Sequence, residues 1–170
     1  MLGGLLGLLT TFKELLRKPV TVQYPKEHLP VAPRYMGFPA LTWDHEVGEP
    51  YCTGCALCMR NCPTQCIKVT MKENPLHQEG KSPRRRTVDT YELNWARCIL
   101  CGICVQVCNF DSIVMSHEHE RSVYSRDGNR MELTQLLEAG RRYQEATGWQ
   151  PTRTRQRAGR GTGTEETSSA

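Results

Sequence analysis

The apolar residues of the first eighteen positions recur close to every 3.6 residues, which is the repeat of an α-helix. They are Leu2, Leu5, Leu6, Leu9, Phe12, Leu15 and Leu16. This spacing predicts an amphipathic helix over residues 1–18. Pro19 ends the helix, because proline cannot continue its hydrogen-bond ladder.

This predicted helix is too short to cross a membrane. Its apolar stretch, Met1–Phe12, is well below the roughly 20 residues that a bilayer requires. We therefore expect the helix to lie on a membrane surface or on a membrane-bound partner. In that position Lys13, Arg17 and Lys18 would face the lipid head groups.

Residues 19–51 show no apolar period and are rich in proline. The prolines are Pro19, Pro25, Pro30, Pro33, Pro39 and Pro50. Because each proline fixes its own backbone and lacks an N–H donor, we expect an extended strap without a core of its own.

The central region, residues 52–117, is an internal repeat. CTGCALCMRNCP begins at Cys52, and CILCGICVQVCN begins at Cys98. The same offset of 46 positions places Ile67 on Ile113. Each half therefore predicts a cysteine loop, a short helical turn and the start of an apolar strand. The expected fold class is α+β, a small module with a pseudo-twofold βαβ repeat.

The C-terminal part of the chain predicts a short extension over residues 118–150. It contains a strand-like piece at Val123–Tyr124, a turn at Asp127–Asn129 and a helix at Glu132–Ala146. Residues 151–170 have no apolar anchors, and we expect this tail to be disordered.

Composition limits both the core and the partners. Hydrophobic content is 38%, with three Phe and three Trp, so a large apolar core is not expected. The net charge of +4 is too small to favour nucleic-acid binding. One dense basic run, Lys81–Arg86, predicts either a solvated loop or a docking site for an acidic partner.

Eight of the nine cysteines lie in the two repeated stretches. The N-terminus has no positive charge ahead of its apolar run and no small-residue cleavage site, so a signal peptide is not indicated. In a reducing bacterial cytoplasm, clustered C-x-x-C spacing indicates metal binding rather than disulfides.

The cysteine spacing, C-x2-C-x2-C-x3-C in each stretch, favours an iron–sulfur cluster over zinc. Three thiolates on one tight loop suit three corners of a cuboidal cluster, whereas zinc sites typically take separated C-x-x-C pairs. In two-cluster ferredoxins the fourth cysteine ligates the other cluster. By that rule, one [4Fe–4S] cluster takes Cys52, Cys55, Cys58 and Cys108, and the other takes Cys98, Cys101, Cys104 and Cys62.

Full thiolate ligation predicts electron transfer rather than substrate chemistry, because no iron is left free to bind a substrate. Apolar residues surround the predicted ligands and would keep water from the sulfurs. They include Ala56, Leu57, Met59, Ile99, Leu100, Ile103, Val105, Val107 and Phe110.

The other residues near the motifs predict structural roles. Cys66 has Ser112 as its counterpart in the second half, and we expect Cys66 to be a small buried thiol. Asn109 replaces the proline found after the first motif, and the cluster should tolerate it. His117 and His119 are expected to be surface residues rather than metal ligands.

Sequence stretches outside the cysteines carry a resemblance to a known family. They are FKELLRKPVTVQYP, RYMGFPAL, YELNWARCILCG and ERSVYSRD. Together with the two cysteine motifs they resemble subunit I of the proton-pumping NADH–quinone oxidoreductase, respiratory complex I, over about residues 5–140. The tail, Asn109 and Cys66 depart from that resemblance.

The resemblance implies an electron-transfer subunit of the peripheral arm, on the cytoplasmic side of the cell inner membrane. Its partners would be an upstream cluster-bearing subunit, a downstream subunit with the cluster next to quinone, and a membrane-arm subunit. The chain has no G-x-G-x-x-G or phosphate-loop motif, so it predicts no substrate site of its own.

Three alternatives remain open at this point. The chain could be the equivalent subunit of a membrane-bound hydrogenase or of a dehydrogenase with another donor, because other subunits choose the donor. It could be a free dicluster ferredoxin, although residues 1–51 have no use in a mobile carrier. It could also be a structural zinc or cluster module.

Overall fold

The computed structural model describes residues 2–151. The tail predicted to be disordered lies outside the described residues except for Pro151. The chain forms two compact units, one ending at Ala32 and the other beginning at Pro33. We refer to residues 33–151 as the body.

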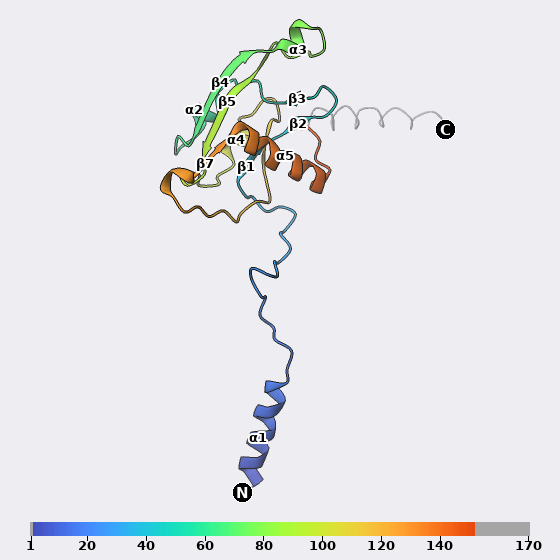
Figure 1. Ribbon diagram of the computed structural model, residues 1–170, viewed down its shortest axis with the longest axis vertical. Coiled ribbons are helices and arrows are strands. Elements are labelled where there is room, and N and C mark those ends of the chain that lie inside the picture. The colour runs from blue at the N-terminus through green and yellow to red at the C-terminus, as the bar shows by residue number, and fades with distance from the viewer. Residues whose placement is uncertain (1, 152–170) are drawn as a thin grey trace, which may run out of the picture. The chain divides into compact units, whose positions relative to one another are not determined.

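The predicted N-terminal helix is present as α1, Leu2–Leu15 (Figure 1). The Thr10 hydroxyl donates a hydrogen bond to the Leu6 carbonyl at 2.9 Å, and Arg17 pairs with Glu14 at 3.3 Å just beyond the last turn. From Leu5 onward, the large apolar side chains of α1 are exposed, from 58% for Phe12 to 78% for Leu15. None of the helices described in residues 2–151 has the length and apolar character needed to cross a bilayer.

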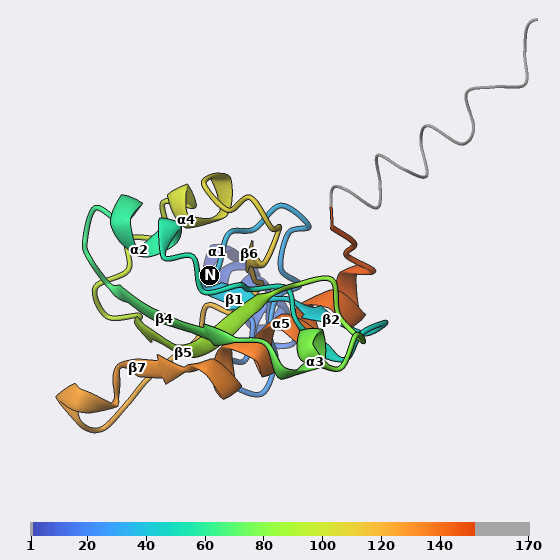
Figure 2. The ribbon, with the colours of Figure 1, turned by 90° about the horizontal axis from the view of Figure 1, so that it is seen from above.

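The body contains three small antiparallel sheets (Figures 1 and 2). The pairs are β1, Pro39–Leu41, with β6, Ile113–Met115, and β2, Trp43–Asp44, with β3, Glu49–Pro50. The third sheet has the order β4, Ile67–Glu73, β5, Arg86–Asn94, and β7, Arg130–Glu132.

Two short helices follow the cysteine loops, and one long helix closes the body. The helical elements of the body are α2, Leu57–Asn61; α3, Pro75–Gln78; α4, Ile103–Gln106; the 3₁₀ turn η1, Arg126–Gly128; and α5, Leu133–Thr147. Mixed helix and strand content, as the α+β class requires, is therefore confirmed. The strand expected at Val123–Tyr124 is wrong, because the strand forms later, as β7.

The second half of the predicted strap belongs to the body. Residues 39–50 form β1, β2 and β3, and Leu41 is 1% exposed. The expectation that residues 19–51 lack a core is therefore wrong for this part. The proline pattern misled because Pro39 starts a two-stranded ladder and Pro50 ends a hairpin, positions where a missing N–H is tolerated.

Helix α5 packs directly on β1. A Cβ atom on Gly140 would lie 1.8 Å from the Leu41 carbonyl oxygen, so only glycine permits this approach. At its start, the Glu132 and Gln135 side chains form a reciprocal capping box. The Gln144 side chain also holds β2, bonding the backbone N–H and C=O of Trp43 at 2.9 and 3.0 Å.

The apolar core is small, as the composition predicts. Its most buried members include Leu41, Leu93, Met131 and Leu136, each 1% exposed. Four cysteines, Cys52, Cys58, Cys66 and Cys104, belong to the same packed cluster of side chains. The core of the body and the cysteine loops are therefore one structure.

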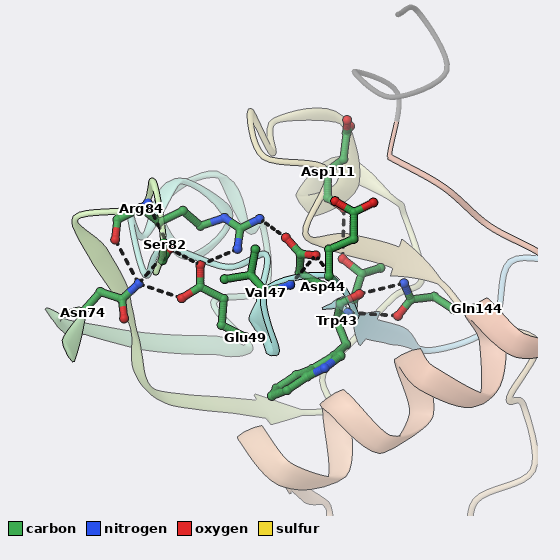
Figure 3. A network of polar contacts seen from close by, with 11 residues as sticks. Trp43, Asp44, Val47, Glu49, Asn74, Ser82, Arg84, Asp111 and Gln144 are labelled. Carbon is green, nitrogen blue, oxygen red and sulfur yellow. Dashed lines mark hydrogen bonds and ion pairs between the residues drawn. The ribbon is translucent and has the colours of Figure 1, made fainter. Parts of the chain in front are cut away.

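A buried polar network adds to this core (Figure 3). The Arg84 guanidinium bridges Asp44 and Glu49, with Nη2–Oδ2 and Nη1–Oε1 distances of 2.5 Å each. Glu49 also accepts hydrogen bonds from Ser82 at 2.5 Å and from Asn74 at 2.6 Å. Glu49 is 3% exposed, so this network places a carboxylate inside the body and satisfies it.

The basic run at residues 81–86 is therefore only partly a surface loop. Arg84 and Ser82 are drawn into the body, which overturns both a solvated loop and a docking site as the account of these two residues. Lys81 stays on the surface, where it pairs with Glu79 at 2.7 Å. In sequence the network lies next to the first cysteine loop, because Glu49 precedes Cys52 by three residues.

Candidate metal centres

The first cysteine loop is shaped by left-handed backbone positions. Gly54 has φ +73° and Ala56 has φ +59°, and α2 begins directly after Ala56. This path buries Cys58 in the first turn of α2. The loop is fixed to the large sheet because the Val88 N–H donates to the Cys52 carbonyl at 3.2 Å.

The second loop repeats this backbone path. Left-handed residues recur 46 positions later, with residue 54 matching Leu100 and residue 56 matching Gly102. The same match extends from Gln65 to Asp111, which both have φ +51°. Cys104 is buried at the start of α4, as Cys58 is in α2. A short helix therefore follows the cysteine loop in each half, as the repeat predicts.

The cysteines that end the two motifs come close to the opposite loop. Burial raises the pKa of the Cys52 thiol to about 12, and the nearby thiols of Cys58 and Cys108 add to this rise. Cys108 is therefore near enough to Cys52 to affect its pKa, although it belongs to the second motif. Burial likewise raises the pKa of Cys58, and Cys108 contributes there as well.

The reverse crossing involves Cys62. Burial raises the pKa of the Cys98 thiol, and the neighbouring thiols of Cys62 and Cys101 contribute. Burial, then Cys98 and then Cys58 of the first loop raise the pKa of Cys104 to about 12. One apolar cavity lies beside these cysteines. Its lining includes Cys62, Cys66, Ile67, Leu93, Cys98, Ile99, Leu100, Cys101, Ile103 and Cys104.

Eight motif cysteines are the number that two cuboidal clusters require, and the structure brings thiols of both loops near one another. No three His, Cys, Asp or Glu side chains within residues 2–151 are close enough to hold a single metal ion. A cluster makes a different demand, because each of its irons takes one thiolate. Buried thiols with raised pKa values bind metal as thiolates and release their protons on binding.

Polar side chains that the sequence did not single out as functional contact these thiols. The Tyr91 hydroxyl donates to Cys58 Sγ at 3.6 Å, and Ser112 Oγ lies 3.0 Å from Cys108 Sγ. Cys66 is buried, as predicted, and its sulfur lies 3.4 Å from Cys62 Sγ. No local signal marked Tyr91, because strand pairing brings it to the loop.

The two histidines after the second motif have structural contacts. The His117 ring packs edge-on against Tyr143, with centroids 5.2 Å apart. The His119 ring packs similarly against Tyr35 at 5.3 Å. His117 is half-buried and His119 is exposed, and the expectation that neither histidine binds metal stays a prediction.

Residues 51–112 match the family model described as a 4Fe-4S dicluster domain. The chain is 36% identical over 132 residues to NADH-quinone oxidoreductase subunit I 2 of Geobacter metallireducens, covering 78% of this chain and 94% of that protein. It is 33% identical over 141 residues to subunit I 2 of Symbiobacterium thermophilum, covering 82% and 56% of the two chains. It is also 37% identical over 131 residues to subunit I 1 of the same organism, covering 77% and 80%. The chain thus spans nearly the whole of one relative and just over half of another.

Proposed function

Because the chain belongs to the NADH–quinone oxidoreductase subunit I family, we propose that it carries electrons between neighbouring subunits of such a complex, toward quinone. It holds two [4Fe–4S] clusters, as its dicluster domain specifies. When bound, each cluster accepts and releases one electron, and no bond to a substrate is made or broken. The chain itself orients the clusters and excludes water from them.

The proposed ligands are the crossed sets. Cys52, Cys55, Cys58 and Cys108 hold one cluster, and Cys98, Cys101, Cys104 and Cys62 hold the other. The observation that carries this assignment is the position of Cys108 beside Cys52 and of Cys62 beside Cys98. Each half of the chain then completes the site of the other half.

The crossing gives a reason for the repeat. The left-handed residues, the two short helices and the cysteines recur at one offset, which supports a module with pseudo-twofold symmetry. With the crossed ligand sets, each motif supplies only three of the four cysteines of its cluster. One half of the repeat therefore cannot bind a complete cluster without the other half. The two halves therefore form one folding unit that conducts between two clusters.

The proposed partners are other subunits of the complex. An upstream subunit supplies electrons, a downstream subunit carries the cluster that reduces quinone, and a membrane-arm subunit or the membrane surface receives α1. The exposed leucines of α1 support that docking, because apolar surface in water costs about 25 cal/mol per Å². The proposed location is the cytoplasmic face of the inner membrane, with no nucleic acid bound.

The metal content tests the cofactor. Anaerobically prepared chain should hold about eight irons and eight sulfides, as two cubane clusters require. Stoichiometric zinc with little iron would instead establish a structural zinc module.

Two cysteine variants test the crossing. Cys62→Ser should damage the cluster of Cys98, Cys101 and Cys104, seen as loss of one of two low-temperature magnetic-resonance signals. Cys66→Ser is the matched control, four residues away, and should retain both clusters. Damage by Cys62→Ser to the cluster of Cys52, Cys55 and Cys58 would refute the crossed sets.

Native purification tests the setting. The chain should sediment with membranes and co-purify with subunits that support quinone reduction by NADH. Recovery with a hydrogenase, or with a dehydrogenase using another donor, would replace the proposed complex. Recovery as a free protein in the cytosol would replace it with a mobile ferredoxin.

A further inference from the structure

Equivalent positions of the two halves carry different hydrogen-bond donors. Ser112 follows Cys108 by four residues, and its hydroxyl lies 3.0 Å from the Cys108 sulfur. Cys66 follows Cys62 by four residues, and its thiol lies 3.4 Å from the Cys62 sulfur. Both side chains are buried, with 2% and 5% exposure. The repeat therefore places a hydroxyl in one site where the other has a thiol.

Each of these side chains also reaches a second cysteine of the same proposed ligand set. Burial raises the pKa of Cys52, and a hydrogen bond from the Ser112 hydroxyl opposes that rise. Burial raises the pKa of Cys98, and a hydrogen bond from the Cys66 thiol opposes it in the same way. The Ser112 and Cys66 side chains thus occupy equivalent positions of the repeat, each beside the last cysteine of its motif.

Tyr91 adds a donor to the first site. It lies on β5 with 4% exposure, and its hydroxyl donates to the Cys58 sulfur at 3.6 Å. At Cys104, the equivalent cysteine, burial and the neighbouring thiols raise the pKa, and the backbone N–H of Val105 opposes them. Cys58 has such a backbone donor as well, from Met59, so Tyr91 is an addition.

The second site has a different set of side-chain donors, in which a thiol takes the place of a hydroxyl. The Thr64 hydroxyl lies 3.5 Å from the Cys62 sulfur, farther than Ser112 lies from Cys108. Its other side-chain donor is the Cys66 thiol, and an S–H group donates more weakly than a hydroxyl. Two hydroxyls, at 3.0 and 3.6 Å, therefore face the first proposed ligand set, and one hydroxyl, at 3.5 Å, and one thiol, at 3.4 Å, face the second.

Hydrogen bonds to cluster sulfurs stabilise the more negative, reduced state and so raise the reduction potential. We propose that Tyr91 and Ser112 hold the potential of the cluster bound by Cys52, Cys55, Cys58 and Cys108 above that of the other cluster. This inference rests on the ligand sets proposed above. Tyr91 and Ser112 are positioning residues, because they act through the ligands and not on a substrate.

The experiment is a redox titration of the full chain with both clusters, reduced by dithionite and followed by magnetic resonance. Each cluster takes one electron. Tyr91→Phe and Ser112→Cys should each lower the potential of the same, higher-potential signal, by about tenfold in the equilibrium constant or ~59 mV for a one-electron couple. The other signal should not move.

An exchange variant is the sharpest form of the test. Cys66→Ser alone should raise the potential of the other signal, and Cys66→Ser with Ser112→Cys should reduce the gap between the two. The matched control is Tyr124→Phe, which removes the same hydroxyl from a fully exposed ring and should move neither signal. Iron content is measured for every variant.

The outcomes separate the inference from the proposed function. Two intact signals that neither Tyr91→Phe nor Ser112→Cys moves would overturn the inference alone. If these two variants move different signals, Cys58 and Cys108 do not serve one cluster, and the ligand sets are wrong. If a variant loses iron, resonance Raman spectra of the unmodified chain in D2O decide. Iron–sulfur stretches of the higher-potential cluster should then shift more than those of the other, and equal shifts would overturn the inference.

Discussion

Residues 2–32 and the body use the same apolar residue types in opposite ways. The leucines of α1 from Leu5 onward are 59–78% exposed, whereas Leu41, Leu93 and Leu136 in the body are 1% exposed. A helix of 14 residues is marginal in water by itself, because most helical stability comes from packing. The comparison teaches that the spacing of apolar residues predicts a helix but does not predict what buries the apolar face of that helix. In the body the cover is intramolecular, and it includes the cysteine loops and a buried ion network.

Removing the metal is expected to have the largest effect, because it should unfold the body and leave α1 unchanged. Cys52, Cys58, Cys66 and Cys104 are part of the core of the body, so chelating the iron should remove its cooperative thermal unfolding transition. The helical signal that α1 gains in lipid vesicles should remain, because no cysteine lies in α1. Circular dichroism with and without vesicles measures both. A metal-free chain that unfolds at the same temperature would contradict this account of the core.

The next largest effect is expected at the ion network. Arg84→Ala leaves Asp44 and Glu49 buried without their cation, and the body should lose about 3 kcal/mol or more of unfolding free energy. Arg85→Ala is the matched control, because Arg85 is its exposed neighbour, and it should cost within about 0.5 kcal/mol. Chemical denaturation of the cluster-loaded chain checks both values. Equal costs for the two variants would show that the network contributes nothing.

A smaller loss is expected where α5 meets β1. Alanine in place of glycine in a helix gains about 1 kcal/mol in propensity. At position 140 the new Cβ would lie 1.8 Å from the Leu41 carbonyl, and relieving such overpacking costs about 1–3 kcal/mol. Gly140→Ala should therefore destabilise the body by about 1 kcal/mol net, and by about 2 kcal/mol at most. Denaturation curves that show stabilisation would mean that α5 moves away from β1 at little cost.

A substitution on the outer side of α5 is the control for that prediction. Glu145 is exposed on the same helix, and Glu145→Ala should change the unfolding free energy by no more than about 0.5 kcal/mol. A loss at Glu145 similar to the loss at Gly140 would indicate a general sensitivity of α5 rather than a close contact.

Local patterns in the sequence predicted the elements that depend on local physics. The helices α1 and α5 follow from apolar periodicity, and both cysteine loops follow from ligand spacing, which the left-handed residues reproduce. Strand β7 was missed because three residues carry too little pattern, and its formation depends on pairing with β5.

Contacts between distant residues were not predictable in the same way. Arg84 looked like one cation among several, and only the folded chain shows two buried carboxylates 35 and 40 positions earlier in sequence beside it. Tyr91 reaches Cys58 across 33 positions through strand pairing. Such residues carry no spacing signal, since their partners are chosen by the tertiary structure. The full set of cluster ligands, by contrast, could be proposed from the sequence, because the same cysteine spacing occurs in both halves of the repeat.

The smallest effect on the stability of the body is expected from deleting the N-terminal helix α1. Removal of residues 2–18 takes away exposed apolar side chains and no member of the core, so the unfolding free energy of the body should stay within about 0.5 kcal/mol. Both cluster signals should persist, while the membrane-bound fraction and NADH–quinone activity fall through failed assembly.

Leu9→Glu with Phe12→Glu should reproduce this loss of membrane binding, because a charge on the apolar face opposes burial in lipid or protein. Thr10→Glu is the matched control, since position 10 projects from a helix about 100° away from position 9 and 200° away from position 12. If the truncated chain still assembles and supports quinone reduction at the normal rate, α1 is not an anchor, and its exposed leucines need another explanation.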